Sequence, residues 1–352
     1  SMDIGERPQT GEAYGLSRVL DSKLQLPQAA ERLDNSLPIY PNEVLIKVEI
    51  LNIDAASFLQ MEEETGKDAE KIGQIILENC KQRGKQQNKV TGSGGMLVGE
   101  VIKVGSQFKG PIALQEKNRV ATLVSLTLTP LHLENIKNIN LNTHQVEAEG
   151  YAILFDSSIV AIMPKDIEEP VAMAVFDVAG APAKVNAVAK PGQSVIVVGG
   201  GGKAGTLSCV AARDQVGKSG KVIAIEPSAS HRAELEALKV CDEVLAVDAT
   251  DSAAVHSGVK KATRDKMGDV VVNVSPAPGT EIASLLCAKE SGTVLFYGMA
   301  TSFSTVALGA EGLASQATLL IGNGFFPGHA EFALNLLRGH SDLKDLFYRR
   351  YA

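Results

Sequence analysis

The chain has 352 residues, of which 45% are hydrophobic and 21% charged, and it carries a formal net charge of −7. That length accommodates two domains with ample core, and the acidic balance, with a pI near 5.5, argues against a nucleic-acid-binding or anionic-membrane surface. No apolar run approaches the roughly 18 residues that a membrane span requires, and the first residues lack the charged and apolar regions of a secretory signal.

The cysteines are scattered along the chain, and neither a second cysteine nor a histidine stands at metal-ligand spacing from any of them: Cys80, Cys209, Cys241 and Cys287. We expect each to be a small buried side chain. We also expect the protein to reside in a reducing cytoplasm, because nothing in this pattern requires disulfides.

Residues 1–167 do not alternate regularly between strand and helix. The pattern predicts an extended segment over 42–54, a helix-rich segment over 57–84, strand-like segments over 96–104 and 119–129, and a polar, turn-prone segment over 135–149. This order indicates a mostly antiparallel, barrel-like domain with one helical insertion.

A different organisation begins near residue 168. An Ala- and Val-rich helical stretch over 170–189 is followed by six apolar strands with helical segments between them, at 194–198, 221–226, 244–247, 269–274, 293–297 and 317–321. Such alternation is typical of a doubly wound parallel sheet, so residues 168–325 are predicted to form an α/β domain of the Rossmann type. The remaining residues, 326–352, contain a last helix that we expect to return to the first domain.

The segment after the first of these strands is the most informative in the chain. It reads Gly199, Gly200, Gly201, Gly202, Lys203, Ala204 and Gly205, and a helix is expected to follow. Glycines at this spacing let the backbone approach a pyrophosphate, and a helix N-terminus directs its N–H groups at the phosphates. The order of strand, glycine turn and helix therefore predicts a dinucleotide site. A P-loop is excluded, because Lys203 is followed by alanine instead of serine or threonine.

The choice between NAD and NADP depends on the end of the second strand. Glu226 lies there, 21 residues past Gly205, where a carboxylate accepts ribose hydroxyls and repels a 2′-phosphate. This favours NAD. Two serines, a histidine and Arg232 follow at once and leave NADP as the alternative, although a helix cap explains the serines as well. We also assign Ser275, just after the fourth strand, to the cofactor site.

The late glycine turn and the barrel-like first half resemble the medium-chain dehydrogenase/reductase superfamily. Residues 96–105 resemble its G-x-V-x-x-V-G segment, 117–120 its G-D-R-V segment, and 191–197 the approach to its nucleotide turn. The resemblance implies an α/β protein with a GroES-like first domain and a Rossmann second domain.

Five more specific blocks are similar to the L-erythro-3,5-diaminohexanoate dehydrogenase family, and they lie at 26–30, 52–58, 91–96, 123–130 and 177–183. This resemblance implies NAD(P)-dependent oxidative deamination of a diamino acid in lysine fermentation, with 5-amino-3-oxohexanoate, ammonia and reduced cofactor as products. It also implies a homodimer that forms through the edge of the sixth strand.

The chain departs from the zinc-dependent members of the superfamily at each zinc position. Asp54 stands where those enzymes have a ligand cysteine, residues 94–96 read Gly-Gly-Met where they have Gly-His-Glu, and their four-cysteine loop is missing. Because catalytic zinc needs about three protein ligands, we expect no zinc.

The implied substrate carries two ammonium groups and one carboxylate, so it calls for carboxylates and a base. We assign proton transfer to Asp54 and Asp177, each of which precedes small residues in a segment that the resemblance places at the border of the superfamily's cleft. The alternatives are a turn cap after the strand for Asp54, and a helix N-cap or a structural partner for Asp177.

Substrate contacts are assigned to Glu62, Lys85, Ser93 and Ser125. Glu62 is a candidate partner of the second ammonium, and Lys85 of the substrate carboxylate. A solvated helix face is the alternative for Glu62, a surface lysine for Lys85, and ordinary turn or strand positions for the two serines.

Three other functions remain open. A zinc-free quinone or enone reductase of the same superfamily would favour NADPH and an apolar pocket. An S-adenosylmethionine-dependent methyltransferase also has a glycine turn followed by an acid-ended strand, although the late position of the turn disfavours it. A non-catalytic nucleotide-binding protein would bind the cofactor without turnover.

Overall fold

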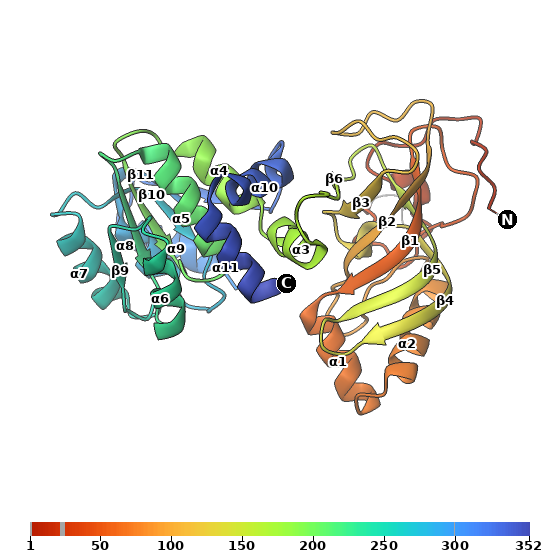
Figure 1. Ribbon diagram of the computed structural model, residues 1–352, viewed down its shortest axis with the longest axis horizontal. Helices are drawn as coiled ribbons and strands as arrows, with labels where there is room; N and C mark the ends of the chain where they lie inside the picture. Colours follow the sequence, from red (N-terminus) through yellow and green to blue (C-terminus); the bar gives the residue numbers. More distant parts are fainter. Residues whose placement is uncertain (1, 22–24, 299) are drawn as a thin grey trace. The chain divides into compact units, whose positions relative to one another are not determined.

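The computed structural model describes residues 2–21, 25–298 and 300–352, and these form two compact units, one up to Pro164 and one over Lys165–Ala352 (Figure 1). Each unit has its own sheet and its own apolar core. The expected α/β class, with an antiparallel first sheet and a parallel second sheet, is confirmed.

The first unit is built on a six-stranded antiparallel sheet with the order β4-β5-β1-β2-β3-β6. In chain order its elements are η1 (Leu16–Arg18), β1 (Val44–Ile53), α1 (Ala55–Thr65), α2 (Ala69–Arg83), β2 (Gly95–Val104), β3 (Arg119–Thr122), η2 (Leu126–Leu128), β4 (Leu131–Asn140), β5 (Gln145–Leu154) and β6 (Val160–Ile162).

The two helices of the expected insertion begin and end at capping residues. Asp54 and Asp68 each accept a backbone N–H of the first turn, of α1 and α2 respectively. Gly66 and Gly84 end these helices in the left-handed conformation that glycine adopts most readily. Asp54 is therefore fixed at the junction between the central strand β1 and α1.

A hairpin occupies the segment that the sequence pattern predicted to be turn-prone. β4 and β5 pair across it, so the prediction for 135–149 is wrong. Two register shifts in β4, after Leu133 and after Ile136, interrupt the strict alternation of apolar and polar residues by which a strand is recognised. Most side chains of β4 beyond Leu133 are exposed, which explains the polar composition.

The second unit carries a six-stranded parallel sheet with the order β12-β11-β10-β7-β8-β9. Its elements are α3 (Glu169–Asp177), α4 (Gly180–Val188), β7 (Ser194–Val198), α5 (Lys203–Val216), β8 (Lys221–Ile225), α6 (Ala229–Ala237), β9 (Glu243–Leu245), α7 (Ser252–Ala262), β10 (Gly268–Asn273), α8 (Glu281–Cys287), β11 (Ala288–Phe296), α9 (Phe303–Gly312), β12 (Thr318–Ile321), α10 (His329–Gly339) and α11 (Ser341–Tyr351).

The strand order of this sheet reverses between β7 and β10, which are neighbours although they are the first and fourth strands along this part of the chain. In doubly wound folds the crevice at such a reversal, outside the carboxyl ends of the strands, is where dinucleotides bind. Gly199 follows β7 and Ser275 lies two residues beyond β10, so both predicted cofactor residues lie at this edge.

The helical stretch over 170–189 is two helices instead of one. α3 and α4 meet at a bend of 55°. The break lies at Val178, whose φ of −131° and ψ of 14° are not helical. Gly180 then packs closely against Gly324: a Cβ on Gly180 would lie 2.2 Å from the carbonyl oxygen of Gly324. No single helix in the described residues is long and apolar enough to cross a membrane, although this bent pair passes the same test of length and composition.

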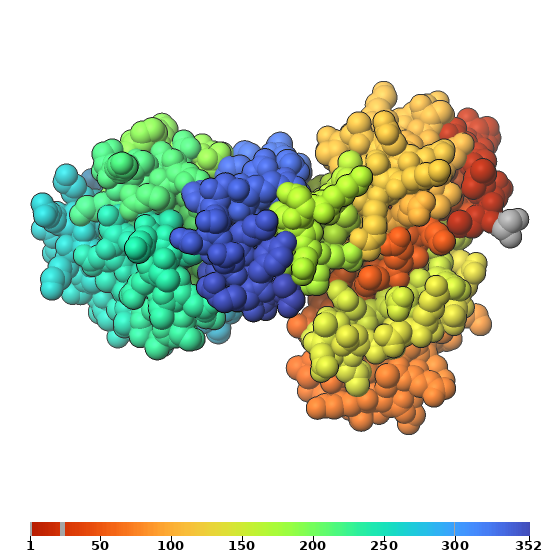
Figure 2. All heavy atoms as spheres, in the orientation of Figure 1, coloured from red at the N-terminus to blue at the C-terminus, as the bar shows by residue number. Residues whose placement is uncertain are grey.

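The C-terminal residues were expected to return to the first domain, but α10 and α11 belong to the second unit. Their apolar faces pack on α3, α4 and α5, where Leu334, Leu337, Leu346 and Phe347 are buried. Figure 2 shows the C-terminal residues, in blue, as a continuous layer on this unit. The end of the chain therefore lies beside the glycine turn.

Candidate active site

The glycine turn joins β7 to α5, and Gly199 and Gly205 are the positions where a Cβ would meet backbone most directly. Gly199 has a φ of +84°, and a Cβ there would lie 2.8 Å from the backbone of Ser275. A Cβ on Gly205 would lie 2.1 Å from the carbonyl oxygen of Gly199. The first of these glycines makes the turn, and the second lets α5 pack against the strand.

Gly202 has a different role, because the space beside it is open. A Cβ at this position would meet nothing closer than the carbonyl oxygen of Gly199, at 3.9 Å. Gly202 is also the N-cap of α5, and no side chain caps the helix there. An uncapped N-terminus of a 14-residue helix beside open space is the arrangement that receives a pyrophosphate. A dinucleotide therefore fits the residues present.

Glu226 reaches back from the end of β8 to the glycine turn. Its Oε1 accepts the N–H of Gly201 at 2.9 Å, its Oε2 accepts the N–H of Ser228 at 3.0 Å, and the residue is only 7% exposed. The carboxylate is thus held at the edge where the adenosine ribose binds in this fold.

The other predicted cofactor residues of the second unit lie next to this carboxylate or the turn. Arg232 donates from Nη1 to the carbonyl oxygens of Glu226 and Pro227, so part of its guanidinium is engaged by backbone. Ser275 is 8% exposed, and its N–H donates to the side chain of Asn273. Both residues are therefore held by hydrogen bonds near the predicted cofactor site.

Lys203 and Asp177 form an ion pair of 2.8 Å across the first turn of α5. The Asp177 side chain is 56% exposed and lies in the last turn of α3, so it does not cap a helix. This geometry matches the structural-partner alternative for Asp177. The Lys203 ammonium also lies 5.7 Å from the ring centroid of Tyr351, in the last turn of α11.

Arg350 was not predicted to be functional. Its Nη2 donates to the carbonyl oxygen of Gly201 at 2.9 Å and lies 3.2 Å from Glu234. The peptide groups of Gly201 are therefore held from two sides, the N–H by Glu226 and the carbonyl by Arg350. Only tertiary packing brings the end of the chain here, so the sequence carried no signal for this contact.

In the first unit, Asp54 has one satisfied and one unsatisfied carboxylate oxygen. Oδ1 accepts the N–H of Ser57 and the hydroxyl of Ser93, each at 2.9 Å. Oδ2 is buried and has no hydrogen-bond partner in the described part of the chain. A buried carboxylate oxygen without a partner is energetically costly, and such groups mark functional positions.

Ser57, Thr91 and Ser93 form a triangle of hydroxyl groups beside Asp54. Ser57 Oγ lies 2.9 Å from Thr91 Oγ1 and 2.7 Å from Ser93 Oγ, and Thr91 Oγ1 lies 2.8 Å from Ser93 Oγ. Of these three residues only Ser93 was predicted. The sequence shows hydroxyl residues at 91 and 93, but their approach to Ser57 depends on the fold.

Glu62 differs from the two acidic residues that follow it. Its side chain is 13% exposed, whereas Glu63 and Glu64 are exposed, so Glu62 is not part of a solvated face. Its Oε1 lies 4.0 Å from Nε2 of His144, and the imidazole of His144 is stacked on Phe58 at 4.4 Å.

Two predicted substrate contacts are occupied by protein groups. Lys85 is fully buried and donates to the carbonyl oxygens of Pro27 and Gln28 at 2.9 and 3.4 Å, so the surface-lysine alternative is wrong. Burial lowers the pKa of Lys85 to about 8. Ser125 caps η2 by accepting hydrogen bonds from the N–H and the hydroxyl of Thr127. This matches the alternative of an ordinary turn position for Ser125.

Gln86 is a candidate that the sequence pattern missed. It is fully buried, and neither Nε2 nor Oε1 has a partner in the part of the chain that the structure describes. Its carbonyl oxygen lies 2.8 Å from where a Cβ on Gly94 would stand, and Gly94 in turn accepts the N–H of Asp54. The backbones of Asp54 and Gln86 thus both approach Gly94.

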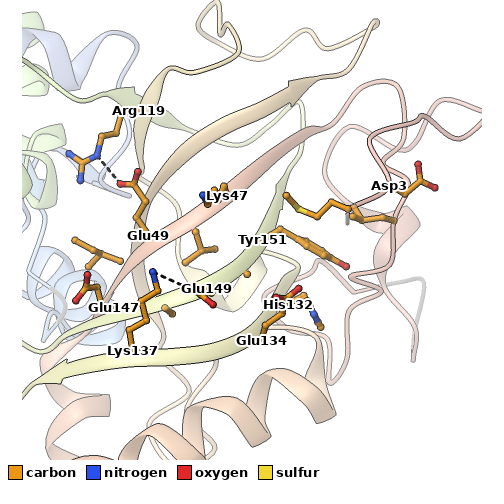
Figure 3. Close-up of a pocket in the computed structure, with 16 residues that line it drawn as sticks. Asp3, Lys47, Glu49, Arg119, His132, Glu134, Lys137, Glu147, Glu149 and Tyr151 are labelled. Atoms are coloured by element: carbon orange, nitrogen blue, oxygen red, sulfur yellow. Dashed lines mark hydrogen bonds and ion pairs between the residues drawn. The ribbon is translucent and has the colours of Figure 1, made fainter.

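A hollow of about 950 Å³ on the first unit contains none of the predicted residues (Figure 3). It lies over the outward face of β1, β4 and β5, and ion pairs join Arg119 to Glu49 and Lys137 to Glu149 across this face. None of the residues predicted for substrate or cofactor lines this hollow, so we do not assign it to the chemistry. The described residues contain no group of three or more His, Cys, Asp or Glu side chains that could hold a metal ion.

Solved structures with a similar fold include a quinone oxidoreductase and a mycobacterial protein. The chain aligns with the quinone oxidoreductase from Coxiella burnetii with a TM-score of 0.52 and 19% identity, covering 88% of this chain and 84% of that one. It aligns with a mycobacterial protein solved in complex with NADPH with a TM-score of 0.54 and 16% identity, covering 88% and 90%. At these identities the likeness establishes the fold alone, which is that of the medium-chain dehydrogenases and reductases.

Curated relatives establish the family. The chain is 42% identical over 341 residues to the L-erythro-3,5-diaminohexanoate dehydrogenase of Acetoanaerobium sticklandii, and 44% identical over 341 residues to that of Fusobacterium nucleatum. Each alignment covers 97% of this chain and 99% of the relative. The family model of the L-erythro-3,5-diaminohexanoate dehydrogenase N-terminal domain matches residues 17–164. The chain belongs to the L-erythro-3,5-diaminohexanoate dehydrogenase family, and the predicted resemblance is confirmed.

Proposed function

We propose that the chain is an NAD-dependent dehydrogenase that oxidatively deaminates L-erythro-3,5-diaminohexanoate to 5-amino-3-oxohexanoate. The observation that carries this proposal is the identity of 42–44% to two dehydrogenases of that name across nearly the whole chain. The structure supports it with a dinucleotide-type glycine turn in one unit and, in the other, a carboxylate of which one oxygen is buried and has no partner in the described residues.

The stoichiometry of this reaction defines what the protein must do. The substrate ammonium at C3, the oxidised cofactor and one water give a ketone, an ammonium ion, the reduced cofactor and one proton. When bound, the nicotinamide cofactor accepts the hydride from C3. The protein must therefore bind and orient a dicationic amino acid, remove one net proton, and admit one water.

Asp54 is the group that we assign as the base. Its Oδ2 is buried and available, while its Oδ1 is fixed by Ser57 and Ser93, so the carboxylate is oriented with one free acceptor. A correctly placed base of this kind contributes roughly 10²–10⁴-fold to a rate. We assign Asp177 a different part, which is to hold Lys203 in place at the N-terminus of α5.

Glu62 is our candidate for the second ammonium group, because its carboxylate is mostly shielded and its nearest titratable neighbour, His144, is 4.0 Å away. Gln86 and Ser93 are further candidates, since each is buried or half-buried and lies near Gly94 or Asp54. Lys85 and Ser125 are less suited, because their polar atoms are already engaged within the protein.

NAD is the cofactor that we propose, in preference to NADP. A carboxylate held at the end of β8 by two backbone N–H groups accepts ribose hydroxyls and repels a 2′-phosphate. Arg232, the cation predicted for a 2′-phosphate, donates instead to the backbone carbonyls of Glu226 and Pro227. The glycine turn and the N-terminus of α5 would hold the pyrophosphate, and Ser275 would border it.

We further propose catalysis without zinc. One oxygen of Asp54 caps α1, and the described residues contain no group of three or more His, Cys, Asp or Glu side chains that could bind the metal. A homodimer is proposed through the edge strand β12, where Ile321 is 64% exposed. A cytoplasmic location is proposed because all four cysteines are free.

The test is absorbance at 340 nm with L-erythro-3,5-diaminohexanoate after treatment with EDTA, with NAD and NADP compared. Rapid reduction of NAD is expected, with weaker reduction of NADP. The absence of reduction with either cofactor, in protein that binds the cofactor, would overturn the proposed substrate and would favour an enone reductase of the same fold. The variant Asp54→Asn is expected to lose activity roughly 100-fold or more while it still binds NAD.

A further inference from the structure

The four oxygens around Asp54 form a continuous path from the buried carboxylate to the protein surface. Ser93 donates to Asp54 Oδ1 at 2.9 Å, and Thr91 Oγ1 lies 2.8 Å from Ser93 Oγ. The path ends at the surface, since Asp54 and Ser93 are half-buried and Thr91 is exposed. Each step is within hydrogen-bond distance, so no water is needed to bridge the path.

The hydrogen count of this cluster is one short. Four oxygen–oxygen contacts of 2.7 to 2.9 Å join Asp54, Ser57, Thr91 and Ser93, but the three hydroxyls supply only one proton each. One contact between two oxygens therefore has no proton of its own, and in the contacts among the three hydroxyls either oxygen can be the donor. The hydroxyl hydrogens can thus be arranged in more than one way, which leaves room for a proton in transit.

The loop that carries Thr91 and Ser93 is fixed in place. The side chain of Asn88 accepts the N–H of Thr91 at 2.9 Å and donates to Gln60 in α1 at 2.8 Å. The backbone N–H of Asn88 donates to the carbonyl of Ser93 at 2.8 Å. The hydroxyl groups are therefore pre-organised by a loop tied to α1.

We propose that Asp54, Ser93 and Thr91 form the proton exit path of the enzyme, with Ser57 as a side branch that orients the two hydroxyls. The inference rests on the proposed function, because the deamination releases one net proton. Asp54 Oδ2 takes a proton from the C3 ammonium, and rotation of the protonated carboxyl group about its Cβ–Cγ bond brings that oxygen to Ser93 Oγ, which receives the proton. Ser93 passes its own hydroxyl proton to Thr91, and Thr91 passes its own to bulk water. Asp54, Ser93 and Thr91 each gain one proton and lose one, so the path returns to its starting state.

The experiment is a single turnover with enzyme in excess over L-erythro-3,5-diaminohexanoate and with saturating NAD. Absorbance at 340 nm follows the reduced cofactor, and a pH indicator in weakly buffered solution follows the released proton. In the wild type the two signals are expected to rise together. In Thr91→Val, which keeps the shape of the side chain and removes the hydroxyl, proton release is expected to lag roughly tenfold behind cofactor reduction.

Matched variants separate the relay from a merely structural effect. Thr91→Ser restores the hydroxyl and is expected to remove the lag. Ser93→Ala cuts the path at its first step and is expected to lag at least as much as Thr91→Val, whereas Ser57→Ala leaves the path intact and is expected to show little lag. Thr305→Val, an exposed threonine of α9 whose hydroxyl bonds to Ser302, serves as the control.

The outcomes are distinguishable. If the wild type shows no change at 340 nm, the proposed function falls and the relay falls with it. If the wild type turns over and Thr91→Val releases its proton in step with cofactor reduction, the relay alone is overturned. A lag that Thr91→Ser removes and Thr305→Val does not show supports the relay.

Discussion

Glu226 holds the N–H of Gly201 at 2.9 Å, so the acid at the end of β8 and the glycine turn after β7 are one hydrogen-bonded unit. The variant Glu226→Gln keeps an acceptor for this N–H and removes the charge that opposes a 2′-phosphate. We expect the ratio of the dissociation constants of NADPH and NADH to shift roughly tenfold in favour of NADPH. Calorimetric titration with each reduced cofactor measures this ratio, and an unchanged ratio would remove Glu226 from cofactor selection.

Alanine substitutions at Gly202 and Gly205 are expected to differ in effect, the first weakening NAD binding and the second lowering the stability of the fold. In Gly202→Ala the new Cβ enters open space, so stability should change by less than about 1 kcal/mol while NAD binding weakens. In Gly205→Ala the Cβ meets backbone at 2.1 Å and has nowhere to move, so destabilisation by about 1–3 kcal/mol or more is expected. Urea denaturation and NAD titration of both variants check the contrast. Equal loss of stability in the two variants would contradict it.

Arg350 should affect cofactor affinity although it lies at the far end of the chain. The variant Arg350→Ala removes the hydrogen bond to the carbonyl of Gly201, so the glycine turn is held less firmly. Because a hydrogen bond from a charged donor contributes about 1.5–3 kcal/mol, we expect the dissociation constant of NAD to rise roughly tenfold. Arg349 is adjacent and exposed, so Arg349→Ala is the matched control. Calorimetric titration with NAD measures the affinity of both variants. The same affinity in Arg350→Ala and Arg349→Ala would show that α11 does not stabilise the glycine turn.

The glycine turn, its flanking strand and helix, and Glu226 were all predictable, because local spacing alone specifies them. The fold class was confirmed for the same reason. The hairpin of β4 and β5 was missed because two register shifts interrupt the alternation of apolar and polar residues. The break between α3 and α4 was missed because Val178 is apolar and is not a residue type that usually ends a helix.

The site was predictable only in part. Asp54 could be named from the family resemblance, but its partners at Thr91 and Ser57 depend on how a loop folds back onto α1. Arg350 lies 149 residues from Gly201 along the chain, and no local pattern relates them. Pairings of this kind come from tertiary packing, which a single sequence does not display.

Lys85 should make stability depend on pH in the alkaline range. Burial lowers its pKa from an ordinary 10.5 to about 8, so between these values the unfolded chain binds more protons than the folded chain. The free energy of unfolding of the wild type, measured relative to Lys85→Met, should therefore rise between about pH 8 and pH 10.5 and stay level below that range. Urea denaturation at pH 7.5 and 9.5 measures the change, and Lys71→Met, an exposed lysine, should show none. A constant difference between wild type and Lys85→Met would mean that Lys85 has an ordinary pKa.

The most direct test of the account is the ratio of ammonium to reduced cofactor when the purified protein acts on L-erythro-3,5-diaminohexanoate with NAD. Oxidative deamination at C3 predicts one ammonium ion for each NADH formed, with 5-amino-3-oxohexanoate as the organic product. NADH formation without ammonium, or no NADH at all while an enone is reduced by NADPH, would contradict it.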